Sequence, residues 1–340
     1  MLNIKLNNKL SLHLVSNFIN FFTSLLGIII LTNNYTTQEF GQFALAQVIF
    51  LICYSISFSN YHFYLNKKII EDHKNEQNYL LDSFVITFFF SCIVYLLLIN
   101  LLPFFIDDIQ ILKLVKIIAL PLILQPMAIT YYSFFIGQKF GKIFIITLIS
   151  SILSITLKLF VAFGKYNIET YAYTYVFDII LIIFLLNLFY FLQVDKVKIN
   201  FSLHRIIQNL KIISLLPLLG FFAVINLRID LIMVSNILGD SNASIYSVSS
   251  RLVIIQITVF FILLKYVYPK LVEDFKNSQM KEFYELYNGL ISLIFLTTIF
   301  LVLIMFFYGN YILKIFGDSY LVSHNLLVIL TSSIFFICLN

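Results

Sequence analysis

Residues Phe221 to Gly239 read FFAVINLRIDLIMVSNILG, and this stretch indicates both a fold class and a functional question. It is long and apolar enough to cross a membrane as one helix, since a span needs about 20 apolar residues. Yet it carries Arg228 and Asp230 well away from its ends. Charged side chains are costly inside a bilayer, so they usually face a polar interior and mark a functional site.

Apolar runs of this kind recur along the whole chain of 340 residues. Hydrophobic residues make up 61% of it and charged residues only 11%, whereas a soluble domain has about 25% charged residues. Long unbroken runs also differ from the short alternating strands of a membrane β-barrel. The sequence therefore predicts an all-α integral membrane protein.

We expect about ten transmembrane helices joined by short connections. They are predicted at 12–32, 42–64, 83–105, 114–136, 143–163, 171–193, 212–235, 244–268, 286–308 and 322–339. Similar openings of the second and eighth spans, GQFALA from Gly41 and SIYSVS from Ser244, favour a parallel repeat of six-helix units. This repeat predicts an N-terminal bundle at 1–195, a linker at 196–211 and a second bundle of four helices at 212–340.

Lysine and arginine concentrate on one side of the predicted topology. The N-terminal segment and the even-numbered loops hold 14 of these residues, against 4 in the odd-numbered loops. Because cytoplasmic loops carry the excess of positive charge, we expect both the N-terminus and the C-terminus in the cytoplasm. Pro121 and Pro126 fall inside the fourth span and could bend it.

Five charged residues on four predicted helices share one depth. With 1.5 Å of rise per residue, each lies roughly 8–10 Å below the outer membrane boundary. Arg228 and Asp230 are only two residues apart and cannot pair directly on a regular helix. The five residues of this charged layer are Lys158, Asp178, Arg228, Asp230 and Arg251.

Two interpretations of the charged layer remain open. Lys158 with Asp178, and Asp230 with Arg251, could be ion pairs that only hold helices together. Alternatively the layer lines a water-filled cavity, whose one surplus positive charge suits an anionic ligand such as phosphate.

Weaker candidates for the same cavity are polar neighbours on the predicted helices. Asn226 shares a helix face with Asp230, Ser247 shares one with Arg251, and Asn17 lies in the first span. No His, Cys, Asp and Glu cluster has metal-ligand spacing, and no glycine-rich phosphate loop is present. We therefore expect neither a metal nor a cofactor.

Several segments resemble the O-antigen flippase (Wzx) type of polysaccharide exporter in the MOP superfamily. SNFINFFTSLLGIIILTNNYTTQEFGQFALAQ, from Ser16, resembles the first helix pair, with an acidic–aromatic–glycine pattern at Glu39, Phe40 and Gly41. RIDLIMVSNILGDSNASIYSVSSRL, from Arg228, resembles the hairpin of helices seven and eight. Tyr268-Pro269 matches a proline that ends helix eight, and ILKIFGDSYLVSHNLLVIL, from Ile312, resembles the loop before helix ten.

The resemblance implies a MATE-like fold of two six-helix bundles around a central cavity that works by alternating access. The substrate would be an O-antigen or capsule repeat unit on undecaprenyl pyrophosphate, moved across the bacterial inner membrane. Partners would include a polysaccharide polymerase and other assembly proteins. In related lipid II flippases, basic residues on helices one, two and eight approach the pyrophosphate; only Arg251 fits that scheme, with Arg228 and Lys158 as substitutes.

The family usually has twelve or more helices, so the resemblance implies an incomplete second bundle and a truncated chain. The protein is expected to be a transporter and not an enzyme. One alternative is a small-molecule or drug cation antiporter of the same fold. A membrane-embedded polysaccharide polymerase is less favoured, because the predicted outer loops are too short for a catalytic domain.

Overall fold

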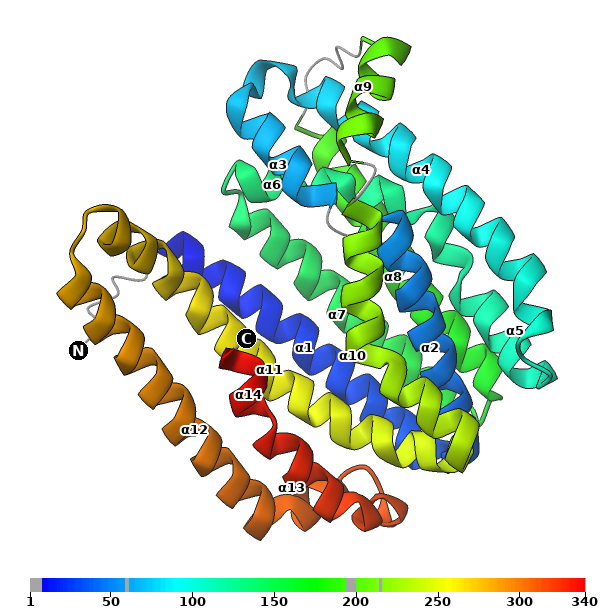
Figure 1. Ribbon diagram of the computed structural model, residues 1–340. Helices are drawn as coiled ribbons and strands as arrows, with labels where there is room; N and C mark the ends of the chain where they lie inside the picture. Colours follow the sequence, from blue (N-terminus) through cyan, green and yellow to red (C-terminus); the bar gives the residue numbers. More distant parts are fainter. Residues whose placement is uncertain (1–7, 59–60, 194–199, 214–215, 340) are drawn as a thin grey trace. The chain divides into compact units, whose positions relative to one another are not determined.

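The computed structural model describes residues 8–58, 61–193, 200–213 and 216–339, and every regular element within these ranges is helical. Side chains are described except at 8–11, 62–63, 212–213, 216, 259, 261–266, 268–270, 273 and 339. Figure 1 shows α1 (Asn8–Asn34), α2 (Thr37–Ser57), α3 (Tyr61–Glu71), α4 (Glu76–Leu101), α5 (Ile109–Ile118), α6 (Thr130–Ile136), α7 (Phe140–Phe163), α8 (Ile168–Phe191), α9 (Leu203–Ile213), α10 (Leu216–Leu238), α11 (Asp240–Lys276), α12 (Met280–Lys314), α13 (His324–Ser332) and α14 (Ile334–Leu339). Short 3₁₀ helices are η1 (His73–Asn75), η2 (Leu102–Phe104), η3 (Leu120–Ile123), η4 (Gln125–Ile129) and η5 (Asp318–Ser323).

Most of these helices are long and apolar enough to cross a membrane. Among the described residues, eight spans meet this condition, and nine do if the bent segment 109–136 counts as one. Large apolar side chains such as Phe88, Phe89 and Leu96 of α4 are exposed on the protein surface. Exposed apolar surface of this extent requires lipid as its solvent. The predicted class, an all-α multi-pass membrane protein, is confirmed.

The second and fourth predicted spans are not continuous helices. The expected span 42–64 is divided, because α2 ends at Ser57 and α3 begins at Tyr61. The expected span 114–136 bends by 48° between Ile109–Ile123 and Gln125–Ile136. Pro121 and Pro126 open the 3₁₀ helices η3 and η4 at the bend. Proline has no N–H to donate and clashes with the preceding turn, so both prolines interrupt the helix where the sequence predicts bending.

The expectation that Pro269 ends the eighth span is wrong. The helix α11 continues without a break to Lys276. A proline within a helix removes a hydrogen bond of the preceding turn and can kink the helix without ending it. The side chains of Tyr268 and Pro269 lie outside the described residues.

The chain divides into two compact units. The first comprises Met1–Tyr35 and Gln42–Asn236, and the second comprises Thr36–Gly41 and Ile237–Asn340. The first turn of α2 thus belongs to the second unit, together with α11 to α14. The proposed bundles at 1–195 and 212–340 remain a prediction, and residues 196–199 of the proposed linker lie outside the described residues.

In the first unit, α1 packs along α7, and α7 packs against α8. The buried face of α7 carries small hydroxyl side chains, including Thr147, Ser150, Ser151 and Ser154. Small residues let membrane helices approach closely, and their hydroxyls can bond to the helix's own backbone. The Ser150 hydroxyl, for example, donates to the Thr147 carbonyl at 2.9 Å.

In the second unit, the first turn of α2 is fixed by a capping box. The Thr36 backbone N–H donates to the Glu39 carboxylate at 2.9 Å, and the Glu39 N–H donates to the Thr36 hydroxyl at 3.2 Å. Phe40 is buried and packs edge-on against the fully buried Tyr320. The hydroxyls of Tyr320 and Ser244 lie 2.9 Å apart.

Gly41 has a steric reason within the same unit. A Cβ at this position would lie 1.8 Å from the backbone oxygen of Asp240, which begins α11. No side chain fits there without displacing backbone. The acidic–aromatic–glycine pattern of Glu39, Phe40 and Gly41 therefore has three distinct structural roles: a cap, a core ring and a close helix contact.

We expect Gly41→Ala to lower the free energy of unfolding by more than the roughly 1–3 kcal/mol that is typical of overpacking. Gly289→Ala is the matched control in the second unit, because a Cβ there meets no atom within 4 Å. Helix propensity predicts that this control is neutral or about 1 kcal/mol more stable. Unfolding in detergent, followed by far-UV circular dichroism, measures both. Equal unfolding midpoints for the two variants would contradict the proposed close contact.

Candidate functional site

Lys158 and Asp178 form a buried ion pair between α7 and α8. These helices are consecutive and antiparallel, with Lys158 near the end of α7 and Asp178 in the first half of α8. The side chains are 8% and 17% exposed. A charge in such surroundings is tolerated only when a partner and hydrogen bonds neutralise it. The pairing considered for these two residues is thus present.

Groups from α1, α7 and α8 surround this pair. The Lys158 ammonium also donates to the Ser154 hydroxyl at 2.8 Å, one turn earlier on α7. Gly27 of α1 faces the lysine, since a Cβ there would lie 3.5 Å from Nζ. Tyr171 of α8 is buried and donates its hydroxyl to the Gly27 carbonyl at 2.6 Å. Three helices therefore meet around one lysine.

One oxygen of Asp178 retains its hydrogen-bonding capacity. Its Oδ2 accepts from Lys158, while Oδ1 is buried and accepts no hydrogen bond from the described residues. Most buried carboxylate oxygens have a donor. An acceptor held without one, beside a lysine, can accept a hydrogen bond from a ligand.

Arg251 lies on α11 in the second unit and is half-buried. Its Nε donates to the Ser247 hydroxyl at 3.1 Å, so the expectation that these two residues share a helix face is confirmed. Its guanidinium carbon lies 6.0 Å from the centre of the Phe40 ring. The serine and the aromatic ring together orient the guanidinium, a group that binds phosphates through two parallel hydrogen bonds.

Arg228 and Asp230 lie on α10, and both are half-buried, while Asn226 is exposed. The Asp230 carboxylate accepts the backbone N–H of Leu231 at 2.7 Å.

Asn17 on α1 is exposed and its amide lies 3.3 Å from a ring nitrogen of His13 on the same helix. Ten residues, about 15 Å of helix, separate Asn17 from Gly27. The structure thus brings Lys158 and Asp178 together, and a common layer with the other predicted site residues remains a prediction.

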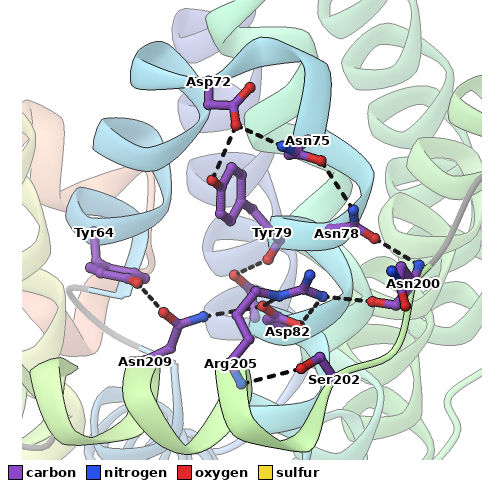
Figure 2. A network of polar contacts seen from close by, with 11 residues as sticks. Tyr64, Asp72, Asn75, Asn78, Tyr79, Asp82, Asn200, Ser202, Arg205 and Asn209 are labelled. Carbon is purple, nitrogen blue, oxygen red and sulfur yellow. Dashed lines mark hydrogen bonds and ion pairs between the residues drawn. The ribbon is translucent and has the colours of Figure 1, made fainter.

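Sequence reasoning missed a second polar centre, shown in Figure 2. Asp82 of α4 is 1% exposed and accepts two hydrogen bonds from the Arg205 guanidinium, one of them at 2.9 Å. The Asn209 amide donates to the same carboxylate at 3.1 Å, and the Tyr64 hydroxyl donates to Asn209. This polar network attaches α9 to α3 and α4.

The polar network continues towards the start of α4. Arg205 donates to the Asn200 carbonyl at 2.7 Å, and the Asn200 N–H donates to the Asn78 amide oxygen at 2.8 Å. Hydrogen bonding to Asp82 raises the pKa of Arg205 above its ordinary value. Apolar packing supports the same attachment, since the buried Ile206 of α9 joins a cluster with Leu65 and Leu80.

One signal in the sequence could have revealed this network. Asp82 immediately precedes the predicted span 83–105, where a lone carboxylate beside an apolar run needs a partner. Arg205, in the predicted linker at 196–211, is that partner.

Comparison with known proteins decides the family. A family model described as "polysaccharide biosynthesis protein" matches residues 30–325 of this chain. The chain belongs to that family. No curated protein sequence matches it significantly.

Solved structures similar to this chain share its fold at low identity. An inward-facing multidrug resistance MATE family transporter of the MOP superfamily has a TM-score of 0.66 and 12% identity, covering 94% of this chain and 80% of the other. An outward-facing form of such a transporter has a TM-score of 0.57 and 11% identity, covering 95% and 76%. A MOP superfamily transporter from Pyrococcus furiosus, described as having a binding pocket of reverse polarity, has a TM-score of 0.52 and 12% identity, covering 96% and 79%.

The expected MATE-like fold is therefore confirmed. The structural likeness establishes the fold alone. Which substrate passes, and which residues bind it, must be argued from the chain itself.

A mutant cycle on Lys158 and Asp178 tests the buried ion pair. Lys158→Met should lower the free energy of unfolding by about 3–5 kcal/mol, because it leaves a buried carboxylate unpaired. Lys158→Met combined with Asp178→Leu should recover most of that loss, since replacing both partners with apolar groups is often neutral. Thermal unfolding in detergent measures the variants.

The exposed pair of Lys113 and Glu169, 3.4 Å apart with 58% and 33% of the side chains exposed, provides the control. Lys113→Met should cost no more than about 1 kcal/mol. A double variant at 158 and 178 that is as unstable as Lys158→Met alone would show that the two residues do not stabilise each other.

Proposed function

We propose that this member of the polysaccharide biosynthesis family is a flippase for oligosaccharide linked to undecaprenyl pyrophosphate. The observation that carries the proposal is the family match over residues 30–325 on a chain with a transporter fold. Polysaccharide repeat units are assembled on a lipid carrier inside the cell and must cross the membrane. A multi-pass transporter in a polysaccharide biosynthesis family fits that step.

Under this proposal, Arg251 is the first candidate to bind the pyrophosphate. Its guanidinium is oriented by Ser247 and lies over Phe40, and arginine matches the geometry of phosphate oxygens. Arg228, Asp230, Asn226 and Asn17 of the first unit are further candidates to contact the substrate. The sugar would move through a wet interior while the prenyl chain stays in lipid.

Lys158 and Asp178 would have a different role, because each neutralises the other. A proton on Asp178 would remove the negative charge and leave Lys158 as an uncompensated cation next to α1. Such a change of charge inside a helix bundle can bias an equilibrium between two arrangements of the helices. The buried Oδ1 of Asp178 supports this role, since it is an acceptor without a donor among the described residues.

A drug cation antiporter of the same fold is the second candidate. The multidrug function of the solved MATE structures and the membrane-embedded carboxylate of Asp178 both favour it. The family description and the arginine at 251 favour the anionic lipid-linked substrate. The two candidates differ in the charge of what they transport.

The cellular placement belongs to the same proposal. The excess of lysine and arginine in alternate loops supports a cytoplasmic N-terminus. The protein would then lie in the bacterial inner membrane, beside a polysaccharide polymerase and other assembly proteins that act on the same repeat unit. It would act as a transporter and would not itself catalyse a chemical step.

Complementation of a flippase-null bacterial strain tests the proposed function. The unmutated chain should restore surface polysaccharide, and Arg251→Ala should reduce it at least tenfold, because one charge-assisted phosphate contact contributes about 1.5–3 kcal/mol. Arg251→Lys should recover part of the loss. Lys116→Ala, an exposed lysine on α5, is the control and should behave like the parent.

Membrane abundance of each variant must be equal for this comparison. Full restoration of polysaccharide by Arg251→Ala would contradict the assignment of Arg251. Drug resistance without polysaccharide would favour the antiporter.

A further inference from the structure

Two adjoining pockets lie on the first unit, away from Lys158 and Asp178. The first, the head pocket, has a volume of about 240 Å³ and is lined by His73, Lys74, Glu76, Asn78, Lys139 and Gln193, among others. The second, the tail groove, has a volume of about 250 Å³ and is lined mainly by Leu81, Phe84, Pro126, Met127, Ile129 and Phe191. Gln77 and Tyr190 line both pockets, so the two adjoin each other.

We propose that these two pockets together bind one anionic glycerophospholipid, with its phosphodiester in the head pocket and an acyl chain in the tail groove. Neither pocket contains a residue of the predicted transport cavity. The lipid would therefore be a structural or regulatory ligand, separate from the substrate.

The charge of the head pocket suits a phosphodiester. Lys74 and Lys139 contribute two positive charges and Glu76 one negative charge, which leaves a net charge of +1. The Lys139 ammonium already donates to the Gln193 amide oxygen at 3.0 Å, which holds it at the pocket. An ammonium has three donors, so this contact leaves donors for phosphate oxygens.

The direction of the tail groove matches that of a lipid. Gln77 lies at the junction of the two pockets, and Phe84 lies seven residues further along α4, about 10 Å deeper. The polar pocket is at the start of α4 and the ends of α6 and α8, the ends that the lysine distribution assigns to the cytoplasm. In Figure 1, α3, α6, α9 and the start of α4 lie at this same end of the first unit. A headgroup at the interface and a chain pointing into the bilayer fit that arrangement.

The head pocket also adjoins the polar network of α9. Asn78 lines the pocket and accepts the Asn200 N–H at 2.8 Å, and Asn200 accepts from Arg205. A bound headgroup would thus stabilise the segment that leads into α9. Lipid binding and the attachment of α9 should therefore strengthen each other.

Native mass spectrometry of the detergent-purified full chain tests this proposal with phosphatidylglycerol as the probe. The variant Lys74→Ala/Lys139→Ala should weaken phosphatidylglycerol binding about 30-fold, because each lysine near the surface contributes about 1 kcal/mol toward an anionic lipid. Lys67→Ala/Lys68→Ala is the matched control, since it removes the same charge from α3 outside the pocket. This control should bind like the parent.

Further probes separate the headgroup from the chain and from other phosphates. Phosphatidylcholine should bind at least tenfold more weakly than phosphatidylglycerol, and inorganic phosphate should not displace the lipid. Leu81→Trp, which fills the tail groove, should weaken phosphatidylglycerol binding while Lys74 and Lys139 are intact. Unfolding midpoints equal to that of the parent verify that each variant is folded, and Lys74→Gln/Lys139→Gln replaces the alanine variant if it is not.

Three results would overturn the proposal. One is equal phosphatidylglycerol binding by the parent and the variant that lacks both lysines. Another is equal binding of phosphatidylcholine and phosphatidylglycerol, which would exclude recognition of charge. The third is tighter binding of a short prenyl pyrophosphate than of phosphatidylglycerol at the same site, which would identify the pockets as part of a substrate route.

Discussion

The neutralisation of charge inside an apolar helix bundle is the constraint on which this structure depends. Charged residues are only 11% of the chain, so each one that enters the bundle must have a reason and a partner. Lys158 and Asp178 neutralise each other's charge between α7 and α8, next to Gly27 of α1. The fully buried Asp82 is satisfied by Arg205 and Asn209, and this attaches α9 to α4. The same rule thus shapes the bundle at two points of its first unit.

The sequence predicts the fold class well, because hydrophobic length is a local property. It also predicts the bend at Pro121 and Pro126 from the missing N–H of proline. Shared depth makes the pairing of Lys158 with Asp178 one of two open interpretations, and the structure contains that pair. It does not predict the break between α2 and α3 or the continuation of α11 past Pro269. Those features depend on packing, which spacing along one segment does not contain.

The missed network shows the same limit for the candidate site. Asp82 and Arg205 are 123 residues apart, and nothing in either segment alone specifies the other as its partner. The predicted charged layer has the same limit. Counting residues gives the depth of each charge along its helix, but it does not give the direction in which the side chain points. The sequence is more informative at Glu39, Phe40 and Gly41. A capping box, a core aromatic ring and a close backbone contact each require one residue type there.

Transport by the purified protein is the measurement that tests the central claim most directly. The full chain would be reconstituted into liposomes with a fluorescent oligosaccharide on undecaprenyl pyrophosphate, and the accessibility of the sugar to an external quencher or glycosidase would be followed over time. A flippase moves labelled sugar between leaflets faster than protein-free liposomes do, and a pH gradient changes the rate if Asp178 couples a proton. The proposed substrate would be contradicted if the sugar moved no faster than in protein-free liposomes while the same preparation transported a cationic dye.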